Sequence, residues 1–300
     1  MGPGIITEPS HLVTPLATVA QLETSASQVD GVPRELEDSV RYETARLNQA
    51  AGILLRLPQE IIAQSIVLLQ RFWTGPSGGS MLKHDSKDVA AASLYLAAKP
   101  SGHSLTPRQF HTVFAFLDSL NGNYTEVASG KSPFTPTWSL SEGDLEVQRE
   151  RLYTNEALIL RTVGFQTHVA LPYSLCINYM QTLDAFSGPD GSALAKQAFA
   201  HLNSALLSPQ RLYLTHQPCA LATASIYLAA REIGVSLPDV EWWEVFDVDR
   251  EELGFLVVAL RSMEGFAADQ QQIWGSGRVS MTVSELRVAI TNAHGSMTGE

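Results

Sequence analysis

The chain has 300 residues, of which 45% are hydrophobic and 17% are charged. This composition is typical of a folded globular protein, and the length suffices for two domains of ordinary size. The formal net charge of −11, without a block of basic residues, argues against direct binding to nucleic acid, whose phosphates need clustered Lys and Arg. No uninterrupted run of about 18 apolar residues predicts a membrane span. We therefore expect neither nucleic acid nor a membrane as a direct partner.

Both ends of the sequence predict loose structure. Residues 1–36 are rich in Pro, Ser, Thr and Gly and predict a disordered arm. Residues 267–300 predict a mostly flexible tail, with one short amphipathic helix near 283–290. We therefore expect the tails to contribute little to the core.

Helical signals follow the N-terminal arm, without a convincing strand. Apolar residues return at helical spacing, Pro58 is suited to a first turn, and Gly164 is a usual C-terminal stop. A long polar loop at 121–143 interrupts the pattern. Five helices are predicted, at 41–55, from Pro58 to Trp73, from Asp85 or Ser86 to Lys99, at 106–120 and at 144–163.

A second set of five helices is predicted after a short connection. The run ASLYLAAK at 92–99 recurs as ASIYLAAR at 224–231, and each copy is apolar on every side, which is typical of a buried helix. We therefore predict an all-α fold of two tandem five-helix repeats, at 37–168 and 169–266, each built around an alanine-rich third helix. The helices of the second repeat are expected at 172–186, 192–207, 218–232, 237–246 and 249–263.

The sequence holds no convincing catalytic constellation. The eight His residues are scattered, without Cys or carboxylates at metal-ligand spacing, and no Gly-rich loop joins a strand to a helix. Cys176 and Cys219 lie in apolar helical surroundings, which disfavours a thiolate and predicts buried free thiols in an intracellular, reducing compartment. We therefore predict a non-catalytic binding scaffold with no cofactor and no metal.

Two five-helix repeats, each with an alanine-rich third helix that ends in a cation, resemble the cyclin fold. Residues 51–58 (AGILLRLP) and 69–73 (LQRFW) resemble the opening of the first cyclin box in L-type transcriptional cyclins. Residues 226–231 (IYLAAR), after Gln217-Pro218, resemble their second box. The segment WWEVF at 242–246 is also similar to the Q-type cyclins. The resemblance extends over about 41–266.

The resemblance implies a function and four site residues. Cyclins bind and activate a cyclin-dependent kinase by pressing the third and fifth helices of the first box against its mobile C-helix. The family's clamping Lys and Glu match Lys99 and Glu156, Leu160 lies one turn further on, and Phe165 matches an aromatic inserted at this interface. The residues themselves also permit an ordinary exposed pair, although a charge amid apolar neighbours, as at Glu156, is costly unless it faces solvent or a partner.

Three departures from the family pattern limit the expectation. Pro100, Ser101, Gly102 and His103 follow Lys99 where family members carry an apolar residue and two acids, and neither the substrate-docking motif of cell-cycle cyclins nor an Arg/Ser-rich tail is visible. The prediction is a regulatory subunit of a cyclin-dependent kinase catalytic subunit, nuclear by resemblance, in RNA polymerase II transcription or RNA processing. The alternatives are a cyclin-fold adaptor without kinase activation and a TFIIB-like factor, which would need a zinc ribbon and basic faces.

Overall fold

The helices of the protein gather into two compact units. The computed structural model describes residues 12–103, 105–120, 138–274 and 281–297, the last five by their backbone alone. The N-terminal unit comprises Ala17–Thr167 with Glu264–Glu300, and the C-terminal unit comprises His168–Met263 with Met1–Leu16. Helices are the regular secondary structure of the described residues, and the predicted all-α class is confirmed. The assignment of 37–168 and 169–266 to two cyclin boxes stays a prediction.

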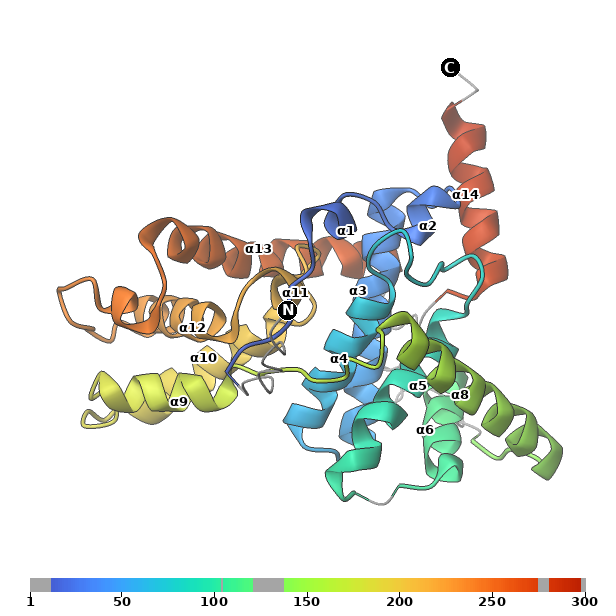
Figure 1. The fold of residues 1–300 in the computed structure, drawn as a ribbon, viewed down its shortest axis with the longest axis horizontal. Coiled ribbons are helices and arrows are strands. Elements are labelled where there is room, and N and C mark those ends of the chain that lie inside the picture. Colours follow the sequence, from blue (N-terminus) through green and yellow to red (C-terminus); the bar gives the residue numbers. More distant parts are fainter. Residues whose placement is uncertain (1–11, 104, 121–137, 275–280, 298–300) are drawn as a thin grey trace, which may run out of the picture. The chain divides into compact units, whose positions relative to one another are not determined.

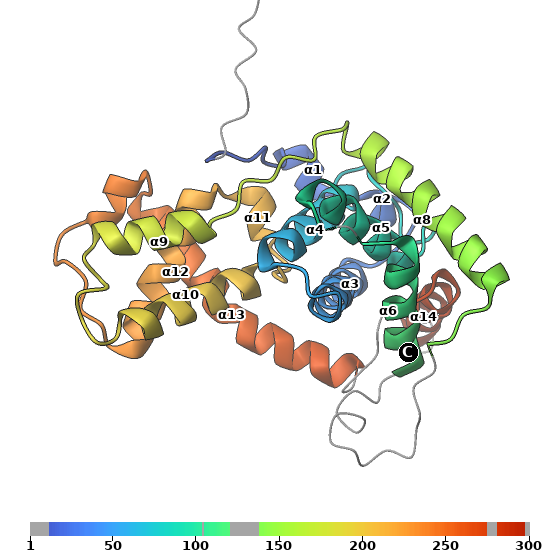
Figure 2. The same cartoon turned by 90° about the horizontal axis from the view of Figure 1, so that it is seen from below.

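The N-terminal unit is built around α5. This helix packs against α3, α4, α6 and α8, and Figure 2 looks nearly along α3 with α4, α5 and α6 around it. Alanines on α5 such as Ala92 and Ala97 are at most 2% exposed, so neighbouring helices approach closely on several sides. The helices of this unit (Figure 1) are α1 (Val19–Glu23), α2 (Ala26–Val29), α3 (Arg34–Leu54), α4 (Gln59–Phe72), α5 (Ser86–Ala98), α6 (Pro107–Leu120), α8 (Glu142–Thr162) and α14 (Val283–Met297).

Two glycines of this unit allow close packing. A Cβ atom at Gly52 on α3 would lie 2.5 Å from the Cγ1 atom of Ile62 on α4. A Cβ atom at Gly79 would lie 2.2 Å from the ring of Phe72, which is fully buried. The glycine-rich segment 75–79 is therefore a tight turn held against an aromatic ring.

The predicted N-terminal arm is partly ordered. Residues 1–11 lie outside the described residues, but α1 and α2 lie within 12–36, and α3 begins at Arg34 instead of Arg41. The polar residues at the start of α3 are buried because they bind one another. The Nη2 atom of Arg41 donates both to Glu37 Oε1 and to the carbonyl of Trp73, each at 2.5 Å. The prediction of a disordered arm is thus wrong for 12–36.

The predicted C-terminal tail also carries structure. The helix expected to end at Met263 continues as α13 (Arg250–Trp274), whose Trp274 Nε1 donates to Ser39 Oγ at 2.5 Å. The short helix expected near 283–290 is α14, which buries Leu286 and follows a hydrogen bond from Ser86 Oγ to the carbonyl of Met281. Residues 275–280 and 298–300 lie outside the described residues, as does 121–137 of the predicted polar loop.

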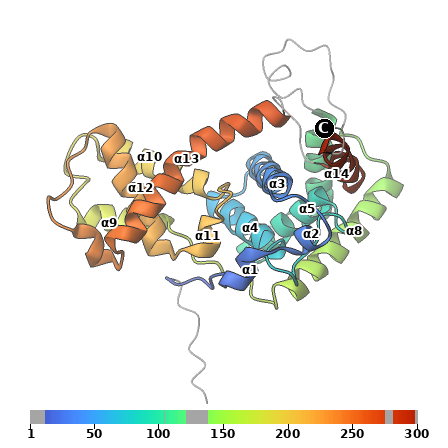
Figure 3. The same ribbon diagram turned by 90° about the horizontal axis from the view of Figure 1, so that it is seen from above.

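The C-terminal unit repeats the arrangement around α12, which packs against α9 and α10 (Figure 3). The repeated run 224–231 lies within α12, and in the first copy residues 92–98 close α5 while Lys99 follows directly after it. The fourth α-helix, predicted at 237–246, is wrong: a 3₁₀ turn, η2, buries Trp242 and stacks Phe246 on Tyr179, with ring centroids 3.8 Å apart. The elements of this unit are α9 (Tyr173–Thr182), α10 (Gly191–Ala205), α11 (Leu212–Thr215), α12 (Pro218–Ile233), η2 (Trp242–Phe246) and the first part of α13.

Candidate functional site

Lys99 lies where α5 ends. Asp85 caps the start of this helix by accepting a hydrogen bond from the Lys87 backbone N–H at 3.0 Å. At the other end, Lys99 begins a 3₁₀ turn, η1 (Lys99–Ser101), and Gly102 closes it in the left-handed region at φ 75°. The ammonium group therefore emerges beyond the apolar part of α5, beside the C-terminal carbonyls that favour a cation.

Lys99 and Glu156 form an ion pair between α5 and α8. The Nζ atom of Lys99 donates to Glu156 Oε1 at 2.6 Å. The two side chains differ in exposure, since that of Lys99 is 48% exposed and that of Glu156 only 10%. The structure thus brings together two predicted site residues that lie 57 positions apart in the sequence. A nearly buried carboxylate is held by a lysine that faces solvent.

Two tyrosines beside the pair were not identified from the sequence. The Nζ atom of Lys99 lies 5.1 Å from the centroid of the Tyr95 ring, and the rings of Tyr95 and Tyr153 are 6.2 Å apart. Burial, with Tyr153 and Glu156 close by, raises the pKa of Tyr95 to about 12, so this phenol stays neutral. Helical spacing could have indicated both, because Tyr95 precedes Lys99 by four residues and Tyr153 precedes Glu156 by three.

Leu160 and Phe165 extend the same end of α8. Leu160 is half-buried, and its carbonyl accepts a hydrogen bond from the Phe165 backbone N–H at 2.8 Å. Phe165 follows Gly164, both have left-handed backbones, and the Phe165 side chain is 70% exposed. The segment after α8 is held by α4, because Arg71 donates to the carbonyl of Gln166 at 3.2 Å. The helix end therefore presents a fixed, exposed aromatic side chain.

Two kinds of feature in the described residues bear on catalysis and on membrane insertion: clusters of reactive side chains and long apolar helices. Among them, no three His, Cys, Asp or Glu side chains gather as a metal site would require. Burial raises the pKa of the Cys176 thiol to about 12, which leaves it without nucleophilic character. Within the same residues, no helix combines the length and hydropathy that a membrane crossing needs.

Comparison with known proteins gives no match to any family model. Individual curated proteins do match. Cyclin-L1-1 of Arabidopsis thaliana is 31% identical over 234 residues, and Cyclin-L1 of Homo sapiens is 30% identical over 234 residues; each alignment covers 78% of this chain. The chain is similar to the L-type cyclins. The sequence-based resemblance to this family is thereby confirmed. The chain spans 52% of the length of the plant relative and 41% of the human one.

Solved structures agree with this cyclin fold. A chain of the yeast RNA Pol II CTD kinase CTDK-1 complex matches with a TM-score of 0.63 and 13% identity, covering 94% of this chain and 84% of its own. A chain of the CAK complex from Chaetomium thermophilum matches with a TM-score of 0.55 and 17% identity, covering 84% of this chain and 70% of its own. At these identities, the matches establish the fold alone.

Proposed function

We propose that this chain is the non-catalytic regulatory subunit of a cyclin-dependent protein kinase, and that it binds the kinase through the end of α5 and the C-terminal half of α8. The observation that carries the proposal is the ion pair of Lys99 and Glu156, with Glu156 nearly buried and Lys99 half exposed. The pair matches the Lys and Glu that the cyclin family uses to hold the kinase C-helix.

The pair suits the recognition of a helix end. Lys99 has three donor hydrogens and Glu156 two acceptor oxygens, and their mutual hydrogen bond at 2.6 Å uses one of each. The remaining groups can bind backbone carbonyls and amides, which are unpaired at the ends of an α-helix. Hydrogen bonds to charged groups are the stronger ones, so this contact favours one orientation of the bound helix.

Leu160 and Phe165 supply the apolar part of the interface. Phe165 is 70% exposed and Leu160 half-buried, and both follow Glu156 at the same end of α8. Aromatic residues that become buried at an interface commonly dominate its binding energy. We therefore assign Phe165 the largest apolar contribution and Leu160 a supporting one.

Activation follows from differential binding. A protein kinase needs an ion pair from its C-helix and an ordered activation loop before it transfers phosphate efficiently. A cyclin surface that binds only the inward position of the C-helix shifts the kinase toward that state by the difference in affinity. The cyclin itself then needs no catalytic group.

The proposed setting is RNA polymerase II transcription or RNA processing, in the nucleus. Its support is the similarity to L-type cyclins, together with the fold shared with a chain of an RNA Pol II CTD kinase complex. The proposal includes a kinase partner and excludes direct contact with nucleic acid or a membrane, in agreement with the net charge of −11.

The decisive experiment compares variants of the full chain in affinity purification from cells, with bound kinases identified by mass spectrometry and assayed for phosphorylation. The Lys99→Ala/Glu156→Ala double variant should lose a kinase that the wild type retains. Arg231→Ala is the matched control, because Arg231 occupies the repeat position equivalent to Lys99 in α12 and is exposed. Recovery of the same kinase by all three chains would show that the kinase binds to another part of the surface. If no chain recovers a kinase, the protein is a cyclin-fold adaptor that does not activate one.

A further inference from the structure

Thr106 is exposed at the start of α6, and Pro107 follows it directly. Proline-directed protein kinases transfer phosphate to a Ser or Thr hydroxyl that precedes a proline. Because proline has no backbone N–H, an apolar pocket that accepts it disfavours other residues, whose N–H would be left unpaired. The chain contains five such Ser-Pro or Thr-Pro pairs, beginning at Thr14, Thr106, Ser132, Thr135 and Ser208.

Burial separates these five pairs. Thr14 and Ser208 are each 3% exposed, so a kinase cannot reach their hydroxyl groups in the folded protein. Ser132 and Thr135 lie outside the described residues. Among the pairs that the structure describes, only the one at Thr106 has an exposed hydroxyl-bearing residue. Thr106 is therefore the accessible acceptor of the three.

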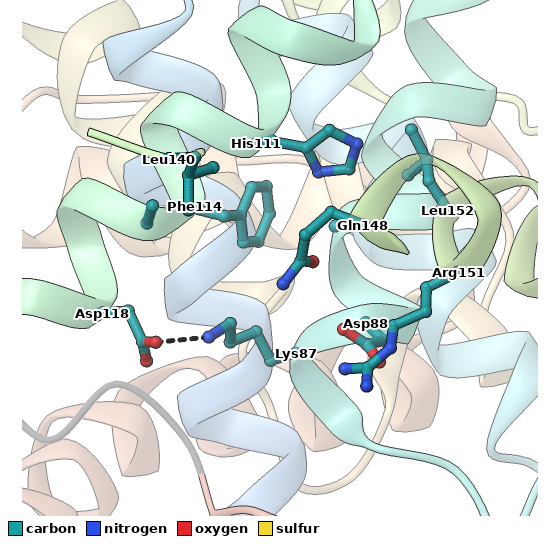
Figure 4. A pocket seen from close by; sticks show the side chains of 11 residues that line it. Lys87, Asp88, His111, Phe114, Asp118, Leu140, Gln148, Arg151 and Leu152 are labelled. Atoms are coloured by element: carbon teal, nitrogen blue, oxygen red, sulfur yellow. Dashed lines mark hydrogen bonds and ion pairs between the residues drawn. The ribbon is translucent and has the colours of Figure 1, made fainter. Parts of the chain in front are cut away.

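The side-chain hydrogen bonds of Thr106 stay within the first turn of α6. Its Oγ1 atom donates to Gln109 Oε1 at 3.0 Å, and the Gln109 backbone N–H donates to Oγ1 at 3.4 Å. The buried side of the helix begins only at Phe110, which is 0% exposed. Further along, Asp118 binds Lys87 of α5 at 2.6 Å (Figure 4). The first turn can therefore open into the extended form that a kinase binds, at the low cost of an exposed helix end, while the rest of α6 stays fixed.

A groove of about 400 Å³ between α6 and α8 includes Thr106 in its lining. Arg108 and Arg149, both exposed, line it from the two helices, with Glu142 and Glu146 as the acidic residues. The Nη2 atom of Arg149 donates to Glu146 Oε1 at 2.6 Å. A phosphate carries about two negative charges near pH 7 and accepts paired hydrogen bonds from arginine, so it displaces a single exposed carboxylate. The glutamates, being exposed, can turn their charge toward water.

We propose that Thr106 is a phosphorylation site for a proline-directed protein kinase, and that its phosphate binds Arg108 and Arg149. In the transfer, the Thr106 oxygen forms a bond to the γ-phosphorus of ATP and the bond from that phosphorus to ADP breaks. The hydroxyl proton passes to the catalytic carboxylate of the kinase. The bound phosphate links the start of α6 to α8. The inference is independent of the proposed function, because the chain is here the substrate of a kinase and not its regulator.

The test treats the folded full chain with Mg²⁺, ATP and a purified mitogen-activated protein kinase, and locates phosphate by mass spectrometry. Thr106 should be phosphorylated, whereas Thr14 and Ser208 should not, because only an unfolded chain exposes them. Pro107→Ala leaves the hydroxyl in place and should slow modification of Thr106 at least tenfold, while Thr106→Ser should still accept phosphate. The site is overturned by no phosphate at Thr106, by an equal rate in Pro107→Ala, or by equal modification of Thr14 and Ser208.

Phosphorus-31 NMR of the phosphorylated chain tests the arginine contacts. The second pKa of a free phosphate ester is about 6, and bound guanidinium groups should lower it by favouring the dianion. Arg108→Gln/Arg149→Gln should raise it again by about half a unit or more. Arg161→Gln, at an exposed arginine of α8 outside the groove, is the matched control and should leave it unchanged. An equal pKa in the double variant and the wild type would overturn the phosphate contacts.

Discussion

The Nζ atom of Lys99 lies 2.6 Å from Glu156 Oε1, so the carboxylate, 10% exposed, depends on a lysine side chain that is itself half in solvent. The dependence is unequal, because Lys99 can be hydrated without Glu156 whereas Glu156 has little access to water. Loss of the lysine should therefore cost more than loss of the carboxylate's charge.

The pair can be tested by a double-mutant cycle in urea. We expect Lys99→Met to lower the free energy of unfolding by about 1–2 kcal/mol, because it leaves a nearly buried carboxylate unpaired. Adding Glu156→Gln should restore part of this loss, because a neutral amide is less costly to bury. Additive losses would show that the two side chains do not interact in solution.

Phe165 should matter for binding and not for folding. Its side chain is 70% exposed, so Phe165→Ala should change the free energy of unfolding by less than about 0.5 kcal/mol. The same variant should weaken kinase binding by tenfold or more if the ring is buried at the interface, as buried aromatics often are. Urea unfolding and a kinase-binding titration on one preparation measure both, and unchanged affinity would remove Phe165 from the interface.

The glycines of α3 and α13 should respond oppositely to alanine. At Gly52 the added Cβ meets Ile62 at 2.5 Å, so Gly52→Ala should destabilise the protein by about 1–3 kcal/mol through overpacking. At Gly254, also helical, nothing lies within 4 Å of the new atom, so Gly254→Ala should stabilise by about 0.5–1 kcal/mol. Thermal unfolding of both variants checks the signs, and a shared sign would contradict the packing argument.

Acid should weaken the fold through His111. Burial lowers its pKa below the unfolded value of 6.5, so the unfolded chain binds the proton first as pH falls. This contribution to stability is complete above pH 6.5 and is lost as pH falls through the lowered pKa. Between about pH 7.5 and about pH 5.5, the wild type should therefore lose more unfolding free energy than His111→Phe does. Equal losses in urea titrations would show that this histidine does not titrate differently on unfolding.

Cys176 should resist thiol reagents in the native protein. It is 0% exposed, and burial raises its pKa to about 12, so the reactive thiolate is scarce. Cys219, less buried, should react first with dithionitrobenzoate near pH 7.5, and both should react after unfolding in guanidinium. Rapid native labelling of Cys176, located by mass spectrometry, would contradict its placement in the core.

The sequence predicted those helices whose buried residues recur at helical spacing within the helix itself. The start of α3 was missed because Glu37 and Arg41 look solvated in the sequence, and only their contact with each other and with the Trp73 carbonyl explains their burial. The 3₁₀ turn at 242–246 was missed because it depends on the stacking of Phe246 on Tyr179. The contacts of Arg41 with the Trp73 carbonyl and of Phe246 with Tyr179 join residues distant in sequence, so no periodicity within one helix records them.

The candidate site, too, was predicted only in part. The sequence indicated Lys99 because it ends an apolar helix, and it indicated Glu156 because its charge interrupts an apolar run. Their contact at 2.6 Å, and the position of the Tyr95 ring 5.1 Å from Lys99, depend on how α5 and α8 pack. The family resemblance named the residues, whereas their unequal exposure is visible only in the structure.

The turn at 75–79 has a practical consequence for labelling this protein. Glycine-rich surface segments are the usual places for an inserted tag or fluorophore. Here the ring of Phe72 fills the space beside Gly79, so an insertion would push an aromatic side chain out of the core. The exposed turn at Gly188, with nothing within 4 Å of a new side chain, is the better attachment point for a reporter.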